Sequence, residues 1–420
     1  MNKVLVSSEV EKLKRVITHR PGNGIGRISP KRSDELLFDD IVFLKTMQKE
    51  HDVFTDLLKA FLGDDNVMEV GQLLLEALDH DPKTKEEIVA MIVDFEELPD
   101  RDITLLESLS NTELSDTLIS GYCAKEDCIL FDPIPNFIFT RDIAVVVNDH
   151  VIITKAAKEA RFRENLLTRF IFWTHPTFEH LKKEGKLINL NNVNLFPPSR
   201  KGEQVSIEGG DIMMIHKDYL LVGCSERTTQ YAIELLRDYL FEHNIIRNVV
   251  QINIPADRHF MHIDTIFTQV DHNLVVAYKP LVEEGISSNV IVHRQERGAK
   301  IYSSIKEFFK AELNFSMEFI FGGGGVSPYQ EREQWTDGCN LVAIKPGVAI
   351  IYDRNIRTID EFEKSGYTVI TAEDLIADIK SGEINPDQVE KTLITLESNE
   401  LSRARGGSHC MTCPIERDNG

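Results

Sequence analysis

Residues 142–153 read DIAVVVNDHVII, which is an acidic residue, a run of apolar residues, a polar turn and a second apolar run. Apolar runs rich in valine and isoleucine and bounded by Asn and Asp predict a β-hairpin. The same pattern returns at residues 211–222, 264–277 and 340–351. A polar residue stands at the head of each copy: Asp142, Asp211, Asp264 and Asn340.

These leading residues are 69, 53 and 76 positions apart, so each repeat has room for a helix and one more strand. Thr228–Phe241 carries apolar residues on one helical stripe and supplies such a helix. The segment Leu13–His19 is a candidate for a fifth unit. Repeats of a ββαβ kind that close in a ring would set all the leading polar residues around one axis, which predicts an α/β fold.

Two stretches interrupt the repeats. Residues 72–128 are poor in strand patterns, and we expect helices at Leu73–Leu78, Lys85–Phe95 and Ile103–Tyr122, with Thr84 and Glu87 as a capping box. We therefore divide the chain into a catalytic unit, residues 1–71 and 129–420, and an inserted helical bundle, residues 72–128. A second stretch, Ala372–Arg403, predicts two short helices.

The composition is that of a globular enzyme: 420 residues, 42% hydrophobic and 27% charged. We find no apolar run of about 18 residues, the length that spans a bilayer, and the N-terminus turns acidic before a signal-peptide core can form. Six scattered cysteines suit a reducing compartment, and we expect a cytoplasmic protein. The net charge of −21 repels nucleic acid and anionic membranes.

Four clusters carry residues suited to chemistry, and three of them head a predicted hairpin. They are PNFIFTRD at 135–142, EGGD at 208–211 with CSERT at 224–228, HID at 262–264, and GGSHCMTCP at 406–414. If the repeats close in a ring, the clusters meet at one end of it.

Each cluster also has an ordinary explanation. Arg141 and Asp142 are compatible with an ion pair at a strand end, and EGGD with a plain turn. His262 and Asp264 lie on one face of a strand, as a metal site or a simple hydrogen-bonded pair. Residues 410–413 form one Cys-x-x-Cys, compatible with redox chemistry, half a zinc site or one catalytic thiol. Because the chain has no second Cys-x-x-Cys, a structural zinc is disfavoured.

Taken together, the clusters suit displacement at a planar cationic carbon. A guanidinium presents its N–H donors in a fixed fork that carboxylates match two bonds at a time, so Asp142 and Asp264 are candidates to hold it. Cys410 would attack the central carbon, and His262 would protonate the departing ammonia and then activate water. Glu208 would orient the imidazole.

The four strings closely resemble those of arginine deiminases, within the guanidino-modifying superfamily, over nearly the whole chain. The resemblance implies a five-bladed, pseudo-symmetric α/β propeller of ββαβ-type repeats with an inserted helical bundle. It also implies hydrolysis of L-arginine to L-citrulline and ammonia through a covalent Cys thiouronium intermediate, without metal or cofactor. We expect a homo-oligomer, a dimer or a tetramer.

Matched motif by motif, the resemblance implies that Cys410 is the nucleophile, His262 the acid and base, and Glu208 its partner. Asp142 and Asp264 would clamp the guanidinium. The residues implied to bind or surround the rest of the substrate are Asn136, Phe139, Arg161, Arg227, Asn340 and Arg405. Cys413 matches a residue that is not the nucleophile, and Ser408 stands where Gly is common.

Four alternatives remain open. An agmatine deiminase is disfavoured because agmatine has no carboxylate for Arg161 and Arg227, whereas an amidinotransferase would need room for an acceptor amine. A metal-dependent hydrolase would use Glu208, Asp211, His262 and Asp264 but leave the terminal cysteine motif unexplained. A propeller without catalytic activity that serves as a binding module is the least favoured alternative.

Overall fold

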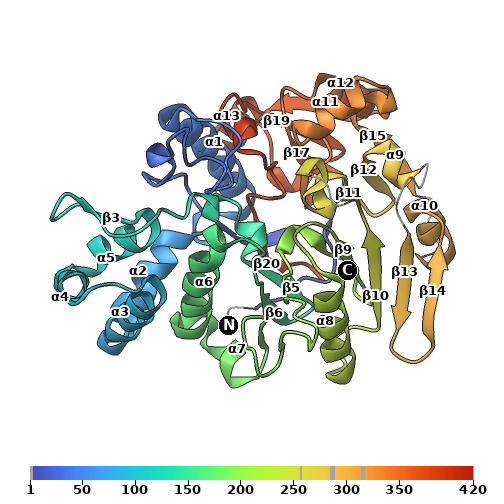
Figure 1. The fold of residues 1–420 in the computed structure, drawn as a ribbon. Coiled ribbons are helices and arrows are strands. Elements are labelled where there is room, and N and C mark those ends of the chain that lie inside the picture. The colour runs from blue at the N-terminus through green and yellow to red at the C-terminus, as the bar shows by residue number, and fades with distance from the viewer. Residues whose placement is uncertain (1–2, 256–257, 284–288, 314–316, 420) are drawn as a thin grey trace.

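A computed structural model describes residues 3–255, 258–283, 289–313 and 317–419 (Figure 1). Its centre is built from five small sheets with one strand pattern: an antiparallel pair of strands, one of which also pairs in parallel with a third strand. The sheets are β20–β1–β2 (Cys413–Arg417, Leu13–Thr18, Val67–Glu69), β5–β6–β7 (Ala144–Val147, His150–Ile153, Leu187–Asn189), β8–β9–β10 (Ile212–His216, Tyr219–Cys224, Asn248–Asn253), β11–β12–β15 (Phe267–Asp271, Leu274–Ala277, Glu318–Phe321) and β16–β17–β19 (Val342–Lys345, Val348–Tyr352, Thr392–Leu396).

The four predicted hairpins are confirmed, and the segment at Leu13–His19 belongs to a fifth sheet, where β1 pairs with β20 from the far end of the chain. The first strands of the sheets are neighbours, since β20 contacts β5 and β11 contacts β16. Two sheets carry additional strands: β13 (Val290–Arg294) and β14 (Gly298–Tyr302) extend one, and β18 (Thr368–Thr371) extends another.

Helices cover the outer sides of the sheets. The predicted helix at Thr228–Phe241 is α8 (Gln230–Glu242), which packs on β9 and begins where the Thr229 side chain accepts a hydrogen bond from the backbone of Ala232. In the same way α6 (Phe162–Thr174) packs on β6. Because helices lie over them, β5 and β6 are almost completely buried and read as continuous apolar runs.

The stretch 72–128 is helical, as predicted, and lies to one side of the sheets (Figure 1). It contains α2 (Val70–His80), α3 (Pro82–Glu96), α4 (Asp100–Ser108) and α5 (Asn111–Ser120), followed by the short hairpin of β3 (Tyr122–Cys123) and β4 (Cys128–Ile129). Its apolar residues join the same hydrophobic cluster as those of β5 and β6.

Two details of this stretch differ from the prediction. The expected helix at Ile103–Tyr122 is two helices, because Ser110 starts a new one: its hydroxyl accepts from the backbone of Glu113, whose carboxylate accepts from the backbone of Ser110. The capping box expected at Thr84 is wrong, since Asp81 is the residue that caps α3.

The stretch 372–403 begins with one of the two expected helices, α13 (Ala372–Ser381), which lies beside α1 (Leu44–Leu62) (Figure 1). In place of a second helix of comparable length, the described residues after α13 contain only the short 3-10 helices η12 (Pro386–Gln388) and η13 (Leu401–Ala404). The chain instead forms β19, which lies between β17 and β18 in the sheet. This strand leads directly to the segment that carries Arg405 and Cys410.

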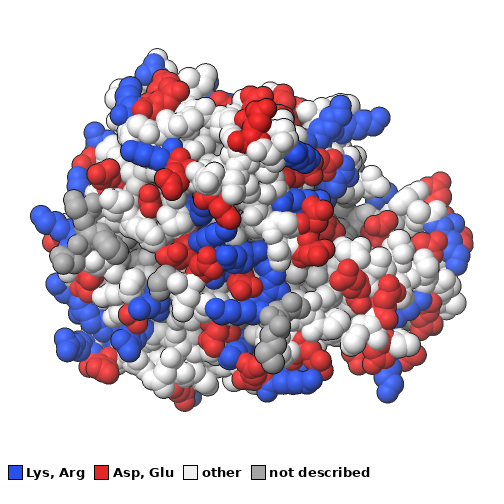
Figure 2. Space-filling view, turned by 180° about the vertical axis from the view of Figure 1, so that it is seen from behind, with Lys and Arg blue, Asp and Glu red and all other residues white. Residues whose placement is uncertain are grey.

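In the described ranges, no helix has both the length and the apolar character needed to cross a bilayer. Acidic and basic side chains are intermixed over the face seen in Figure 2. On that face, the negative charge is therefore not gathered into a separate acidic patch.

Replacing Ser110 by alanine should destabilise the protein by about 1 kcal/mol, because the first turn of α5 loses a side-chain cap. The measurement is the free energy of unfolding in urea. Thr104→Ala, at an exposed position within α4, is the matched control and should change stability by less. Equal effects of the two substitutions would show that the cap contributes nothing.

Candidate active site

Three short turns bring the acidic and histidine residues of the site together. The turns η4 (Thr140–Asp142), η7 (Gly209–Asp211) and η9 (Ile263–Thr265) lie just before the first strands of three sheets, and η7 contacts both η4 and η9. Asn340 and Cys410 stand before β16 and β20 in the same way. The leading residues of the repeats therefore meet at one end of the sheets.

The two glycines of the EGGD string allow these turns to approach one another. A Cβ on Gly210 would lie 2.7 Å from Nδ1 of His262, and a Cβ on Gly209 would lie 1.9 Å from the carbonyl oxygen of Arg141. Both distances are far inside van der Waals contact. The string is therefore more than a plain turn, because any side chain there would push His262 or Arg141 out of place.

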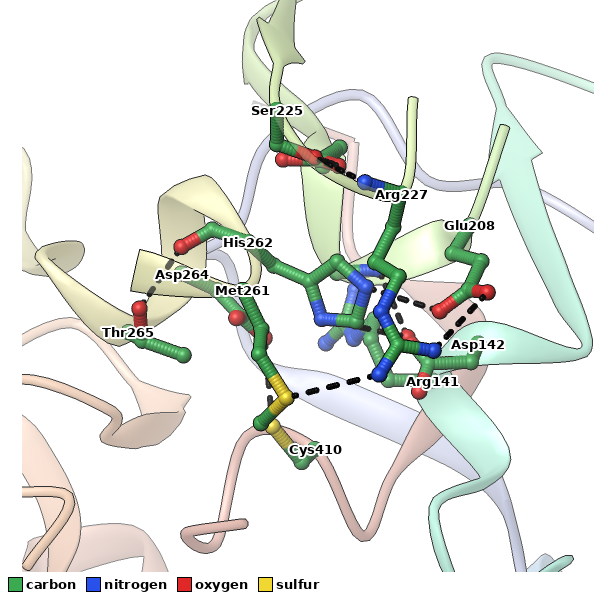
Figure 3. Close-up of polar contacts among 12 residues, drawn as sticks. Arg141, Asp142, Glu208, Ser225, Arg227, Met261, His262, Asp264, Thr265 and Cys410 are labelled. Carbon is green, nitrogen blue, oxygen red and sulfur yellow. Dashed lines mark hydrogen bonds and ion pairs between the residues drawn. The ribbon is translucent and has the colours of Figure 1, made fainter. Parts of the chain in front are cut away.

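His262 and Glu208 form a buried pair. Nε2 of His262 lies 2.9 Å from Oε2 of Glu208, and Nδ1 lies 3.8 Å from Oδ1 of Asp142 (Figure 3). Burial alone would lower the pKa of His262, but the charge of Asp142 and the hydrogen bond with Glu208 outweigh it and raise this pKa to about 10. The ring is thus an imidazolium at neutral pH, ready to donate a proton.

Cys410 approaches the same space from another side (Figure 3). Its sulfur lies 3.4 Å from Oδ2 of Asp264, and its backbone N–H donates to Oδ1 of Asn340 at 3.1 Å. Burial, together with the charges of Asp264 and Asp142, raises the pKa of the Cys410 thiol well above its ordinary value. Without a cation beside it, Cys410 is therefore a thiol.

The second cysteine of the Cys-x-x-Cys string has a different environment. Cys413 belongs to β20, and its Sγ lies 3.1 Å from the carbonyl oxygen of Ala144 in the core. Burial raises the pKa of this thiol to about 12. Both cysteines are free thiols.

Asp264 has one oxygen engaged and one available. Nδ1 of His409 lies 2.9 Å from Oδ2, whereas Oδ1 is buried and accepts no hydrogen bond from any residue in the described part of the chain. Burial would raise the pKa of Asp264, but the hydrogen bond with His409 lowers it. A buried, ionised carboxylate with a free oxygen suits a cationic donor such as a guanidinium.

Asp142 is already paired. Its Oδ1 accepts from the backbone of Gly210 at 3.0 Å, and its Oδ2 accepts from Nη1 of Arg161 at 2.6 Å. Arg161 also donates to Glu164 at 2.8 Å and lies 3.5 Å from Glu208. Charge balance of these carboxylates is thus one function of Arg161.

Arg227 is held more loosely. One end of its guanidinium lies 3.8 Å from Oε1 of Glu208 and the other 3.8 Å from the sulfur of Met261, while Nε has no hydrogen-bond partner among the described residues. Figure 3 shows the contacts of this guanidinium with Glu208 and with Met261. Arg227 therefore has N–H groups available for a ligand, whereas the N–H groups of Arg161 are largely engaged by carboxylates.

A cavity of about 40 Å³ joins these groups. It is lined by Leu37, Asp39, Asn136, Phe139, Asp142, Arg161, Glu208, Arg227, Met261, His262, Thr265, Ala404, Arg405 and Cys410. Arg405 lies 3.2 Å from Asp39 and stacks over the ring of Trp335. The predicted residues Asp264 and Asn340 lie behind Cys410 instead of lining the cavity. Because the cavity is narrow, its side chains must move apart to admit an organic substrate.

Asp142, Glu208 and His262 also lie close enough together to hold a metal ion. The geometry favours a different use, because Nη1 of Arg161 already supplies a cation between the two carboxylates. Asp211, which the metal alternative needs, instead accepts hydrogen bonds from Ser225 and from the backbone of Ile263. The site therefore fits a metal centre poorly, because Arg161 lies between two of the candidate ligands and Asp211 is already hydrogen-bonded.

Some residues of the site were not predicted. Leu37, Asp39, Met261 and Thr265 line the cavity, and Glu9, Arg141 and Asp337 are buried charged residues close to Cys410 or its neighbours. Arg141 belongs to the PNFIFTRD string, and that motif was a reason to place it near the site. Glu9 belongs to no string, and only its burial in the folded chain reveals it.

The sequence matches one protein family. The sequence model of the family described as arginine deiminase matches residues 34–125 and 103–417. An arginine deiminase of Mycoplasma capricolum subsp. capricolum is 31% identical over 99% of this chain and 98% of its own length. One of Treponema denticola is 31% identical over 98% of each chain.

Solved structures share the mixed α/β fold at low sequence identity. A dimethylarginine dimethylaminohydrolase in an adduct with S-methyl-L-thiocitrulline has a TM-score of 0.51 at 15% identity, covering 96% of this chain and 99% of its own. The amidinotransferase SxtG from Microseira wollei has a TM-score of 0.52 at 14% identity, covering 99% and 98%.

Asp264→Asn should speed the alkylation of Cys410 by iodoacetamide at neutral pH, measured by mass spectrometry on the enzyme alone. Removing the carboxylate charge lowers the thiol pKa, and each unit gives roughly tenfold more thiolate. Burial remains, so the rate should still rise with pH. Cys410→Ala identifies the labelled peptide, and an unchanged rate in Asp264→Asn would mean that the thiol does not sense this charge.

Proposed function

The chain belongs to the arginine deiminase family, and from that premise we propose how its residues hydrolyse L-arginine. As an arginine deiminase it is a hydrolase of arginine metabolism that releases ammonia and leaves L-citrulline. The proposal rests above all on one observation: Asp264 is a buried carboxylate whose Oδ2 lies 3.4 Å from the sulfur of Cys410, while its Oδ1 accepts no hydrogen bond from a described residue. The other supporting features are the His262–Glu208 pair and the cations at the cavity.

The first step is capture of the guanidinium. Oδ1 of Asp264 accepts one N–H of the substrate, and Asp142 takes another edge of the fork once the Arg161 side chain shifts away from Oδ2. The substrate brings a positive charge to within reach of Cys410. Burial and the neighbouring carboxylates keep the empty site's thiol protonated, and a cation beside the sulfur offsets both, so the pKa of Cys410 falls and the thiolate is favoured.

The second step forms and resolves a covalent adduct. The thiolate bonds to the guanidino carbon, His262 gives its proton to the departing nitrogen, and ammonia leaves a Cys410 thiouronium. His262, now neutral, takes a proton from water, and the hydroxide adds to the same carbon. The carbon–sulfur bond then breaks, which releases L-citrulline and restores Cys410. Glu208 stabilises the imidazolium at both ends of this cycle.

The remaining residues hold the body of the amino acid. We assign Arg227 and Arg161 to the α-carboxylate, with Asn136 beside them and Phe139 along the aliphatic part. Asn340 supports the nucleophile through the backbone of Cys410, and Arg405 stands at the mouth. Arg227 is the better placed of the two arginines, because Arg161 is already engaged by three carboxylates.

The five sheets of one pattern are proposed to be the blades of an α/β propeller. The supporting contacts are those between β20 and β5, η4 and η7, η7 and η9, β11 and β16, and β16 and β1. Residues 72–128 would be an insert in the first repeat, packed on it through a shared core. We further propose that the enzyme works in the cytoplasm as a homo-oligomer.

Cys410→Ala should abolish the conversion of L-arginine, while Cys413→Ala should keep most of it, because only the first sulfur reaches the cavity. The assay measures citrulline and ammonia in the presence of EDTA. Inhibition of the wild type by EDTA would favour the metal alternative. Equal losses in the two variants would favour redox chemistry by the cysteine pair.

Arg227→Leu should narrow the preference for L-arginine over agmatine, which lacks the carboxylate. A charged hydrogen bond contributes about 1.5–3 kcal/mol, and unpaired polar groups in a pocket reject a deficient analogue by a factor on the order of 10⁴. The measurement is kcat/KM for both substrates in the wild type and the variant. Comparable use of agmatine by the wild type would contradict the carboxylate assignment and leave the cysteine chemistry intact.

A further inference from the structure

Arg405 lies between the cavity of the site and the surface of the protein. Together with Asp39 it lines both that cavity and a second one of about 590 Å³, whose lining includes the exposed residues Glu331 and Arg332. Nη1 of Arg405 lies 3.2 Å from Oδ2 of Asp39, and its guanidinium carbon lies 3.4 Å from the centre of the Trp335 ring. The passage between the two cavities therefore runs past this side chain.

The backbone at Arg405 has a conformation that needs support from its surroundings. Its φ of 62° lies in the left-handed region, which arginine rarely adopts. The next residue is held on both sides: the hydroxyl of Tyr352 donates to the carbonyl oxygen of Gly406 at 2.7 Å, and the N–H of Gly406 donates to the carboxylate of Asp337. Because strained residues persist only where neighbouring groups hold them, these two bonds help to fix Arg405.

Asp337 belongs to a turn that also holds the nucleophile. The backbone N–H of Asn340 closes the turn by donating to the carbonyl oxygen of Asp337 at 3.0 Å. The side chain of Asn340 accepts the backbone N–H of Cys410 at 3.1 Å. Residues 337–340 therefore hold the C-terminal segment at two points, Gly406 and Cys410, through two different side chains. The contact of Asp337 is thus separable from the contact that supports the nucleophile.

Asp337 is a buried acid with little around it to stabilise its charge. It is 5% exposed, and its Oδ2 accepts no hydrogen bond from any residue that the structure describes. Burial raises the pKa of Asp337 to about 7, and the charge of Arg405 is the strongest influence that opposes this rise. The charged or titratable groups around the carboxyl are Arg354, Arg405, Asp264, Cys339, Tyr352 and Cys410. The ionised form therefore depends on Arg405, because burial favours the protonated acid.

We propose that Asp337 is a positioning residue for the reaction: its carboxylate binds the N–H of Gly406 and attracts the guanidinium of Arg405, which keeps Arg405 over Trp335 beside the passage to the cavity. The reaction itself is that of the proposed function. Protonation of Asp337 removes this attraction, so Arg405 no longer lines the cavity in one fixed position and the substrate binds more weakly. KM for L-arginine therefore rises as the pH falls through the titration of Asp337. The value of kcat changes little, because Asn340 still holds the nucleophile.

Asp337→Asn removes the charge and keeps an oxygen for the N–H of Gly406. Above about pH 7 the KM of the variant should exceed that of the wild type by about three- to tenfold, because loss of a charge interaction on the order of one pKa unit is worth a factor of ten. Below this pH the two KM values should converge, since the wild type is then protonated as well. Asp360→Asn, at an exposed position in α12 (Ile356–Lys364), makes the same charge change and should follow the wild type. Equal KM values of Asp337→Asn and the wild type at every pH would overturn the proposal.

Stability separates positioning from support of the fold. The pKa of Asp337 in the folded chain lies above the value of about 4 in an unfolded chain, so the neutral form favours folding. This contribution is fully present below about pH 4 and is lost as the pH rises through about 7. Asp337→Asn should therefore resist urea better than the wild type above that pH, although it uses arginine less well. A variant that loses stability and activity together would show that Asp337 supports only the fold.

A double substitution tests whether Asp337 acts through Arg405. In the background of Arg405→Gln, the change Asp337→Asn should raise KM no further, since the two residues belong to one interaction. The measurement is KM for L-arginine in the wild type, the two single variants and the double variant above about pH 7. Additive effects would place the action of Asp337 elsewhere and contradict the proposal.

The fluorescence of Trp335 gives a readout that needs no substrate. The chain has two tryptophans, so Trp173→Phe leaves Trp335 as the only one. Its emission should change as Asp337 titrates near pH 7 and should lack this change in Asp337→Asn; the nearby ring of His259 is present in both proteins and cancels in the comparison. Identical titrations overturn the positioning of Arg405. The expected titration in a protein that fails to hydrolyse arginine would overturn the proposed function and leave this positioning in place.

Discussion

Charge balance inside the protein is the constraint on which the site depends. An ionised side chain buried without a partner costs several kcal/mol, so each carboxylate at the meeting point of the sheets needs a cation. Arg161 serves Asp142, Glu164 and Glu208, and His262 adds to the balance of Glu208. Oδ1 of Asp264 is one of the buried oxygens near Cys410 that accept no hydrogen bond from a described residue. The balance of charge therefore supports the proposed binding of a substrate cation at Asp264.

Local sequence pattern was enough to predict the four hairpins, because the two strands of each hairpin are immediate neighbours in the chain. The run from Ala144 to Ile153 is apolar on both faces and turns at Asn148, which adopts a positive φ of 51°. The failures were places where two local rules competed. Ser110 interrupts an apolar helical periodicity with a cap, and residues 392–396 form a strand because β17 and β18 lie on either side of them.

Candidate site residues could be named from the sequence where they belong to a short motif. They could not be named where their position depends on contacts with residues far away in the chain. Cys410, His262 and Glu208 were named from their strings, and the fold brings them together. Nothing in residues near Glu9 indicates that it faces His409, 400 positions away in the chain. The alternative of an ion pair between Arg141 and Asp142 illustrates the same limit: Arg141 pairs with Glu9, and Asp142 pairs with Arg161.

The same electrostatics make the substrate a participant in its own activation. In the empty site Cys410 is a thiol and His262 an imidazolium, the protonation states that suit neither attack nor water activation. In the proposed mechanism, a guanidinium at Asp264 supplies the positive charge that the thiolate needs, and transfer of a proton from His262 to the departing nitrogen leaves His262 as the base that the second step needs. Citrulline is neutral and returns no charge to Asp264, so the thiol regains its proton and the product loses its strongest attraction to the site. One uncommitted carboxylate oxygen thus favours both attack on a cation and release of a neutral product.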